Sequence, residues 1–422
     1  MVSFLKKSVV YLLFLMFISS AYAPLLAKEN AGSNLDSQKE LALLRGEHYL
    51  YVQASDDVGQ FHIFFSFPPD YQYQVPIYLG IFNDTTADVL HYQIENDANE
   101  PNKLINFTIG PMEEDERVLI HFTFWVLVEN HDYSDLPDSV EFPDISDLPE
   151  ETKIWLSATE VAQKDSFIIR LKARQLRGLS DNVVRFAGRI APFIKWHRYP
   201  SFVLQLNLAL FMSQDAITTL FIGGENVGRS HLGCALLRSQ NIPARVLLAH
   251  NDQGFWTQMH YMFEYYLPDY GWVLIDSTKG ETPYDTKRQI INRVCYPEDE
   301  NDTKDDYIIP FMKGEERWLW IDNDNVEPWY VDCNEGSKSQ MFIEGGDFAT
   351  SQTVDDTMTL TRTVLPLYQT YLGQNLTGPN LLHFQNATGY QEDALQELQD
   401  SDIEGYIDAM NFSYQEYMSI TP

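Results

Sequence analysis

Residues 224–278 constrain the fold more than any other part of this chain, because a helix, a turn and a strand hairpin are predicted there in succession. Leu232, Leu236 and Leu237 recur with helical spacing behind a Gly-Glu-Asn start. Asn241 then ends the predicted helix, and Pro243 follows two residues later. Three short segments rich in β-branched and aromatic residues come next and predict strands: 245–250, 260–267 and 272–276.

The motifs in this segment resemble those of the transglutaminase-like superfamily. The run that ends at Arg245 reads Leu-Leu-Arg-Ser-Gln-Asn-Ile-Pro-Ala-Arg, a strand begins with His260, and Trp272 precedes Asp276 as in that family. The resemblance implies a papain-type core with a Cys, His and Asp triad, and it places His260 and Asp276 in triad positions. The supporting motif positions are Glu264, Trp272 and Arg245.

The nucleophile position of the family does not hold a cysteine. The family pattern has this Cys nineteen residues before the Arg of the Ile-Pro-Ala-Arg run, and here that position is Asn226. A carboxamide cannot supply the thiolate that attacks a carbonyl group. The nearest thiol, Cys234, is eight residues further along the predicted helix, which is roughly 12 Å along its axis and on another face. Its apolar neighbours favour a small buried residue over a displaced nucleophile.

Asn226 also fits a structural role, because Asn is among the best N-cap residues and stabilises a helix start by about 1 kcal/mol relative to Ala. Asn in place of Cys would remove thiol reactivity while satisfying the cap. In a hairpin whose turn centres on Pro268, Asp276 lies opposite His260, where a carboxylate can orient an imidazole. We therefore expect a relict or altered site of His260 and Asp276, with Asn226 at the nucleophile position.

The composition indicates a globular chain that does not bind nucleic acid. Its 422 residues, 44% of them hydrophobic, are enough for two or three domains. The 29 basic and 61 acidic residues give a formal net charge of −32, whereas nucleic-acid phosphates require a basic face. Lys6 and Lys7 precede an apolar run and small residues, which predicts a signal peptide or an uncleaved N-terminal anchor in residues 1–27. We expect the rest of the protein to be secreted or at the cell surface, with membrane contact only through an uncleaved anchor.

The remaining sequence predicts an α+β protein with four further parts. Residues 28–131 contain six aromatic and β-branched segments separated by turn residues, which favour an immunoglobulin-like β-sandwich. Residues 132–153 are an acidic, Pro-rich linker without periodicity. Residues 154–285 are the transglutaminase-like domain that the resemblance implies, with two helices expected between positions 165 and 196. Residues 286–422 are expected to be a mostly helical C-terminal extension with acidic loops, to which we assign no chemistry.

A cluster of cations is unusual in so acidic a chain. A basic face can hold an anionic polymer such as a surface glycan, but the net charge favours pairing with acidic groups of the protein itself. The cluster consists of Arg170, Lys172, Arg174, Arg177, Arg185, Arg189, Lys195 and Arg198.

Cysteine and asparagine motifs give further candidate sites. An exported protein could form a disulfide between Cys295 and Cys333 and leave Cys234 buried. The sequence contains no Cys-x-x-Cys, His-x-x-x-His or Gly-rich phosphate loop, so we expect no metal and no other cofactor. Six Asn-x-Ser/Thr sequons are candidate glycosylation sites: Asn83, Asn106, Asn301, Asn375, Asn386 and Asn411.

Three functions stay open at this stage. The first is a degenerate, non-catalytic protein that binds peptide or a surface polymer in the papain-like groove. The second is an active thiol acyltransferase or peptidase, which would need Cys234 at the site or water activated by His260 and Asp276. The third is a purely structural surface protein. Asn226 argues against the second, and the presence of His260, Glu264 and Asp276 favours the first over the third.

Overall fold

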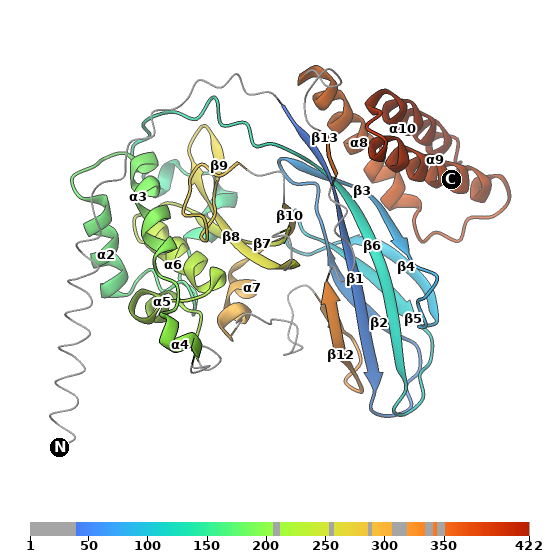
Figure 1. The fold of residues 1–422 in the computed structure, drawn as a ribbon, viewed down its shortest axis with the longest axis horizontal. Coiled ribbons are helices and arrows are strands. Elements are labelled where there is room, and N and C mark those ends of the chain that lie inside the picture. The colour runs from blue at the N-terminus through green and yellow to red at the C-terminus, as the bar shows by residue number, and fades with distance from the viewer. Residues whose placement is uncertain are drawn as a thin grey trace.

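The computed structural model describes residues 39–205, 212–252, 257–285, 289–305, 319–333, 341–343 and 351–421. The predicted signal peptide or anchor at residues 1–27 lies outside these ranges. Figure 1 shows a β-sandwich in the middle, an α+β body on one side of it and three C-terminal helices on the other. The α+β class and the helical C-terminal segment are confirmed. None of the described helices is both long and apolar enough to span a bilayer.

Two antiparallel sheets form the sandwich, and their facing sides are rich in aromatic rings. The ring of Phe122 lies 4.9 Å from that of Phe65 in the opposite sheet. Buried and half-buried residues alternate from Phe61 to Phe65, which is the period of a strand with one face in the core. The strands from the N-terminal part of the chain are β1 (Leu41–Ala54), β2 (Phe61–Phe67), β3 (Gln74–Ile81), β4 (Val89–Asn96), β5 (Lys103–Ile109) and β6 (Arg117–Glu129).

Strands from far along the chain complete both sheets. β12 (Val326–Cys333) and β13 (Met341–Ile343) pair with β1, and β11 (Leu319–Ile321) pairs with β2. The strand orders are β12-β1-β6-β3 and β11-β2-β5-β4. Residues 319–343 were expected in a separate C-terminal extension, because their short apolar segments do not indicate which sheet they join. The immunoglobulin-like classification of the sandwich is not confirmed.

The α+β body packs a layer of helices against a third sheet, which has the order β10-β7-β8-β9. Its helices are α2 (Phe167–Arg177), α3 (Val183–Lys195), α4 (Ser201–Gln205), α5 (Ala216–Ile222), α6 (Asn226–Arg238) and α7 (Pro297–Asp302). Its strands are β7 (Ala244–Asp252), β8 (Thr257–Leu267), β9 (Gly271–Ile275) and β10 (Gln289–Val294). Half of the residues of the predicted linker are exposed. It contains one short 3-10 helix, Ile145–Asp147, and the start of a second, Glu150–Leu156. The hydroxyl of Tyr133 in the linker accepts a hydrogen bond from the Leu274 N–H.

Helix α6 is the central element of this body, since every residue from Val227 to Arg238 is buried. Gly233 allows its close approach to β8. A Cβ atom at this position would lie 2.3 Å from the ring of Phe263, a distance that no ordinary contact reaches. The close packing of α6 on β8 brings the N-terminus of the helix near His260.

Side-chain amides of the sandwich cover the edge strand β10. Gln74 both accepts a hydrogen bond from the Ile291 N–H (2.7 Å) and donates one to the Ile291 carbonyl (2.8 Å). Asn102 makes the same pair of contacts with Val294, at 2.8 and 2.9 Å. These buried amides satisfy backbone groups that an open sheet edge would leave unpaired, so they fix the α+β body to the sandwich.

Three helices follow at the C-terminal end of the described chain: α8 (Ser351–Tyr371), α9 (Gly378–Gln399) and α10 (Ile403–Met418). Helices α8 and α9 pack against β3 at the edge of the first sheet, and α10 packs against both of them. The hydroxyl of Tyr368 lies 3.2 Å from the Leu79 nitrogen and 3.1 Å from its carbonyl oxygen. Gln391 donates to the carbonyl of Ile77. The helices therefore protect this sheet edge on the side of the sandwich opposite the α+β body (Figure 1).

Candidate functional site

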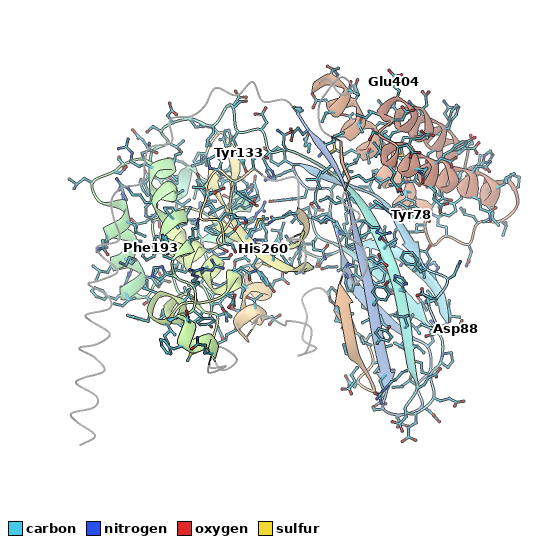
Figure 2. The ribbon with its side chains drawn as sticks, viewed as in Figure 1. Tyr78, Asp88, Tyr133, Phe193, His260 and Glu404 are labelled. Atoms are coloured by element: carbon cyan, nitrogen blue, oxygen red, sulfur yellow. The ribbon has the colours of Figure 1, made fainter. Side chains whose placement is uncertain are left out.

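His260 lies where the helical layer of the α+β body meets its sheet (Figure 2). Its ring is 3% exposed and is held between two polar side chains. The Nε2 atom lies 3.2 Å from Oδ2 of Asp276, and the Nδ1 atom lies 3.1 Å from Nδ2 of Asn226. The structure therefore brings together the three residues at the predicted triad positions, from β8, from the loop after β9 and from the start of α6.

Asp276 is held in place by the backbone of its own loop. Its Oδ1 atom accepts hydrogen bonds from the N–H groups of Thr278 (2.6 Å) and Lys279 (2.8 Å), which leaves Oδ2 for His260. Burial raises the pKa of Asp276, but the hydrogen bond and charge of His260 and these two N–H groups outweigh it, so the net pKa is lowered from its usual value. The side chain is thus a buried carboxylate at neutral pH.

The carboxylate determines which nitrogen of the neutral imidazole carries the proton. A carboxylate only accepts hydrogen bonds, so Nε2 of His260 donates to Asp276 and Nδ1 is left as an acceptor. The Asn226 amide donates to that acceptor. Asn226 therefore contacts the atom to which a thiol at the same position would give its proton, but a carboxamide has no nucleophile to offer in return.

The hairpin register differs from the prediction. Phe263 pairs with Ile275 and Leu267 with Gly271, so the turn is centred one residue later than Pro268, and Asp276 follows the last residue of β9. His260 and Asp276 are consequently diagonal neighbours rather than directly opposed. The His260 and Asp276 side chains are nevertheless long enough to contact each other from diagonal positions.

The predicted capping role of Asn226 is also wrong. The N-cap of α6 is Glu225, whose side chain makes no capping hydrogen bond, and Asn226 is the first helical residue. Its amide points to His260 instead of to the helix backbone. The choice of Asn at this position is therefore explained by the contact with the imidazole and not by the cap.

Two residues that the sequence analysis missed hold the site together. Arg229 lies one turn after Asn226 and donates to the carbonyl of Ser277 (3.0 Å) and to the hydroxyl of Thr278 (3.3 Å). The hydroxyl of Ser277 donates to the Asn226 carbonyl (3.1 Å). Both contacts tie the loop that carries Asp276 to the start of α6. The sequence signal that could have identified Arg229 is its position three residues after Asn226, which places both residues on the same face of the helix.

No described thiol reaches the site. Cys234 is fully buried in the middle of α6, and burial raises the pKa of its thiol far above the ordinary value. Its neighbours are the core residues of the helix, as predicted for a small apolar residue. Cys234 is therefore a core residue of α6 and not a nucleophile displaced along it.

The supporting motif residues occupy a second cluster, at the contact between the sandwich and the α+β body. Glu264 is four residues beyond His260, about 13 Å along the strand. Glu264 pairs with Arg245, and the hydroxyl of Tyr71 from the sandwich bonds to both. The Arg245 guanidinium also lies 3.8 Å from the ring centroid of Trp272 and 4.6 Å from that of Trp155. Arg245, Glu264 and Trp272 thus stabilise the body that carries the site, and they do not contact His260.

The candidate modification sites differ in their surroundings. Asn83, Asn375, Asn386 and Asn411 are exposed. By contrast, the Asn106 amide donates to Glu95, and Asn301 accepts a hydrogen bond from the Glu160 backbone. The Cys295–Cys333 disulfide stays a prediction, because the Cys333 side chain lies outside the described part of the chain. Within the described ranges, no group of three His, Cys, Asp or Glu side chains is arranged to hold a metal ion.

Residues 200–277 match the family model of the transglutaminase-like superfamily. The chain therefore carries a transglutaminase-like domain. The matched residues include Asn226, His260 and Asp276, so the three side chains described above lie within this domain.

A solved structure of low sequence identity shares the fold of this chain. A protein from Cytophaga hutchinsonii described as a putative cysteine protease matches with a TM-score of 0.51 and 16% identity, over 74% of this chain and 94% of its own. A putative protease from Parabacteroides distasonis matches with a TM-score of 0.23 and 12% identity, over 54% of this chain and 42% of its own, and supports no argument. No curated protein matches the chain.

The lowered pKa of Asp276 predicts a pH-dependent contribution to stability. The carboxylate is stabilised in the folded state, so its contribution is present above the unfolded value of about 3.8 and is lost as the pH falls through the lower folded pKa. Urea unfolding of wild type and Asp276→Asn should therefore show a difference in unfolding free energy that shrinks as the pH falls below about 4. A difference that does not change with pH would contradict the assigned ionisation of Asp276.

Proposed function

We propose that this protein is a degenerate, non-catalytic member of the transglutaminase-like superfamily that binds peptides at the His260 site. The observation that carries the proposal is the contact between the Asn226 amide and Nδ1 of His260. The imidazole and its carboxylate are in place, but the group that they would activate is a carboxamide.

The alternative of a working thiol enzyme finds little support in the geometry. Cys234 would have to leave the core of α6, where its neighbours along the helix are all buried. A hydrolase in which His260 activates water directly would need a water at Nδ1, and the Asn226 amide occupies that hydrogen-bonding position. Both routes require the site to rearrange.

A peptide ligand is favoured by the backbone at the start of α6. The first N–H groups of a helix have no partner within the helix, and the Glu225 side chain does not satisfy them here. Peptide carbonyl oxygens and glutamine carboxamides are acceptors of the kind that such N–H groups bind. The ligand is then held at the position of an acyl substrate and released unchanged, and a surface polymer rich in amide groups is recognised by the same chemistry.

We further propose that the protein acts outside the cytoplasm, either secreted or at the cell surface. The proposal rests on the basic and apolar N-terminal sequence and on the net charge of −32. The exposed sequons Asn83, Asn375, Asn386 and Asn411 would be accessible to glycosylation there.

Chemical labelling of the wild-type protein tests whether it is catalytic. Native protein is treated with iodoacetamide at neutral pH, modified residues are mapped by mass spectrometry, and ammonia release from glutamine-containing peptides is measured alongside peptide binding. We expect Cys234 to stay unmodified in the folded protein, peptides to bind, and no ammonia to be released. Fast labelling of Cys234 that abolishes an activity would show that the protein is a live thiol enzyme.

A further inference from the structure

The outer face of α2 combines cations with large apolar side chains. Phe167, Arg170, Leu171 and Arg174 are all exposed and recur with the spacing of one helical stripe. Phe167 is 71% and Leu171 is 41% exposed. The opposite side of the helix buries Ile169 and Ala173, as is usual for an amphipathic helix. The exposed side of α2, however, also carries apolar side chains.

The outer face of the neighbouring helix α3 has the same character. Arg185 and Lys195 are exposed on it, and Trp196, which follows the helix, is 68% exposed. The buried faces of α2 and α3 both contact α6, and the two helices contact each other. We call the exposed residues Phe167, Arg170, Leu171, Arg174, Arg185, Lys195 and Trp196 the basic-apolar face. Figure 1 places these helices on the part of the α+β body remote from the sandwich.

The charge of this region is opposite to that of the rest of the chain. Residues 164–205 contain nine of the 29 Lys and Arg residues but only two of the 61 Asp and Glu residues. The expectation that these cations pair with the protein's own acidic groups is correct for Arg177, which binds Asp181. It fails for Arg170, Arg174, Arg185 and Lys195, none of which forms an ion pair with a described residue.

The exposed apolar side chains distinguish between two kinds of anionic partner, a soluble polyanion and a lipid bilayer. A soluble polyanion can neutralise the cations, but it has no apolar phase to cover Phe167, Leu171 and Trp196. An anionic bilayer surface satisfies both, because headgroup phosphates bind Arg and Lys while Phe, Leu and Trp side chains enter the boundary of the acyl chains. The strongly acidic remainder of the chain is repelled by the same surface, which orients the protein with the α+β body toward the membrane.

We propose that the basic-apolar face of α2 and α3 is a peripheral membrane-binding surface that recognises anionic lipid headgroups. This contact is independent of any N-terminal anchor and of the His260 site. It holds the transglutaminase-like domain against the bilayer and leaves the sandwich and the C-terminal helices pointing into the medium.

Vesicle sedimentation with the full chain tests the proposal. Wild-type protein is mixed with vesicles of phosphatidylcholine, or of phosphatidylcholine with phosphatidylglycerol, at low and high salt. We expect binding to the anionic vesicles to exceed binding to the neutral ones and to fall with salt. Reversal of two charges in Arg170→Glu/Arg174→Glu should reduce binding to anionic vesicles at least about tenfold. Phe167→Ser/Trp196→Ser should also reduce it, although this variant keeps every charge.

Matched controls separate this surface from other causes of binding. Lys103→Glu/Arg117→Glu makes the same charge change on the sandwich and should bind like wild type. An N-terminal anchor would insert into neutral and anionic vesicles alike, so only the difference between the two is attributed to the basic-apolar face.

Three results would overturn the proposal. The first is equal binding of wild type and Arg170→Glu/Arg174→Glu to anionic vesicles. The second is binding to dextran sulfate that Phe167→Ser/Trp196→Ser does not weaken, without binding to vesicles, which assigns the face to a polymer. The third is a dimer in sedimentation velocity that the same variant abolishes, without lipid binding, which assigns the face to a second copy of the chain.

Discussion

With cysteine in place of Asn226, the protein should react with iodoacetamide at pH 6 on the order of 100-fold faster than any thiol that the wild type exposes in its folded state. The new thiol would lie at the N-terminus of α6 and beside Nδ1 of His260. Both neighbours stabilise a thiolate, which brings the pKa of such cysteines to about 3.5–7.5 from about 8.5. Wild-type Cys234 is fully buried and its pKa is raised.

Controls identify the origin of the reactivity. Ser146→Cys places a thiol on an exposed turn, and its labelling rate should rise with pH around the ordinary thiol pKa of about 8.5. In Asn226→Cys the midpoint should lie below pH 7, and adding His260→Ala should move it back toward that of Ser146→Cys.

Activity is the second readout of this variant. If peptides bind at the His260 site as proposed, Asn226→Cys should release ammonia from glutamine-containing peptides, and the wild type should not. An unreactive cysteine at position 226, or one whose pH profile matches Ser146→Cys, would show that the His260 site is not organised for catalysis and that the protein is not a triad enzyme with one residue exchanged.

Replacement of Arg238 by methionine should lower the free energy of unfolding by about 3–5 kcal/mol. Arg238 and Glu300 are both fully buried, and they form a bidentate ion pair in which Nη1 lies 2.9 Å from Oε2. Arg238 also donates to the carbonyl oxygens of Ala244 (2.8 Å) and Ser157 (3.2 Å). Methionine fills a similar volume but leaves the Glu300 carboxylate without its cation in a site that water does not reach.

Urea unfolding measures this change. The variant Arg238→Met/Glu300→Gln removes both charges and should recover at least half of the loss, because a neutral amide is less costly to bury than an unpaired carboxylate. Arg170→Met, which removes an exposed and unpaired cation, should stay within about 0.5 kcal/mol of wild type. A loss for Arg238→Met as small as that for Arg170→Met would contradict the proposed role of the buried pair.

The limits of sequence reasoning are visible in particular residues. Local patterns predicted the elements well: the six segments expected in residues 28–131 are the strands β1–β6, and the helix with Leu232, Leu236 and Leu237 is α6. Spacing within the motifs also identified Asn226, which the structure places beside His260. The sequence did not predict the exact pairing of His260 and Asp276, because the turn after β8 is centred one residue later than Pro268 indicates.

Contacts between distant segments had no local signal. The aromatic character of Trp320 and Tyr330 suggests strands, but nothing in the residues themselves says that β11 joins β2 and β12 joins β1. The separation of the motif residues into two clusters could not be predicted either, because it depends on a contact with a distant segment. Glu264 and Arg245 follow the family pattern, yet the partner that completes their cluster is Tyr71 of the sandwich.

The distant strands have a consequence for the order in which the protein can be made. Among the described strands β1 is synthesised first, and it can pair with β6 on one side. Its other edge pairs with β12, for example Gln53 with Glu327, and stays unpaired until almost four fifths of the chain has been synthesised. The transglutaminase-like domain lies entirely between the two partners and can fold while the sandwich is still open. A nascent or prematurely terminated chain therefore exposes unpaired strand edges at β1 and β2, and such edges are sites at which chains aggregate.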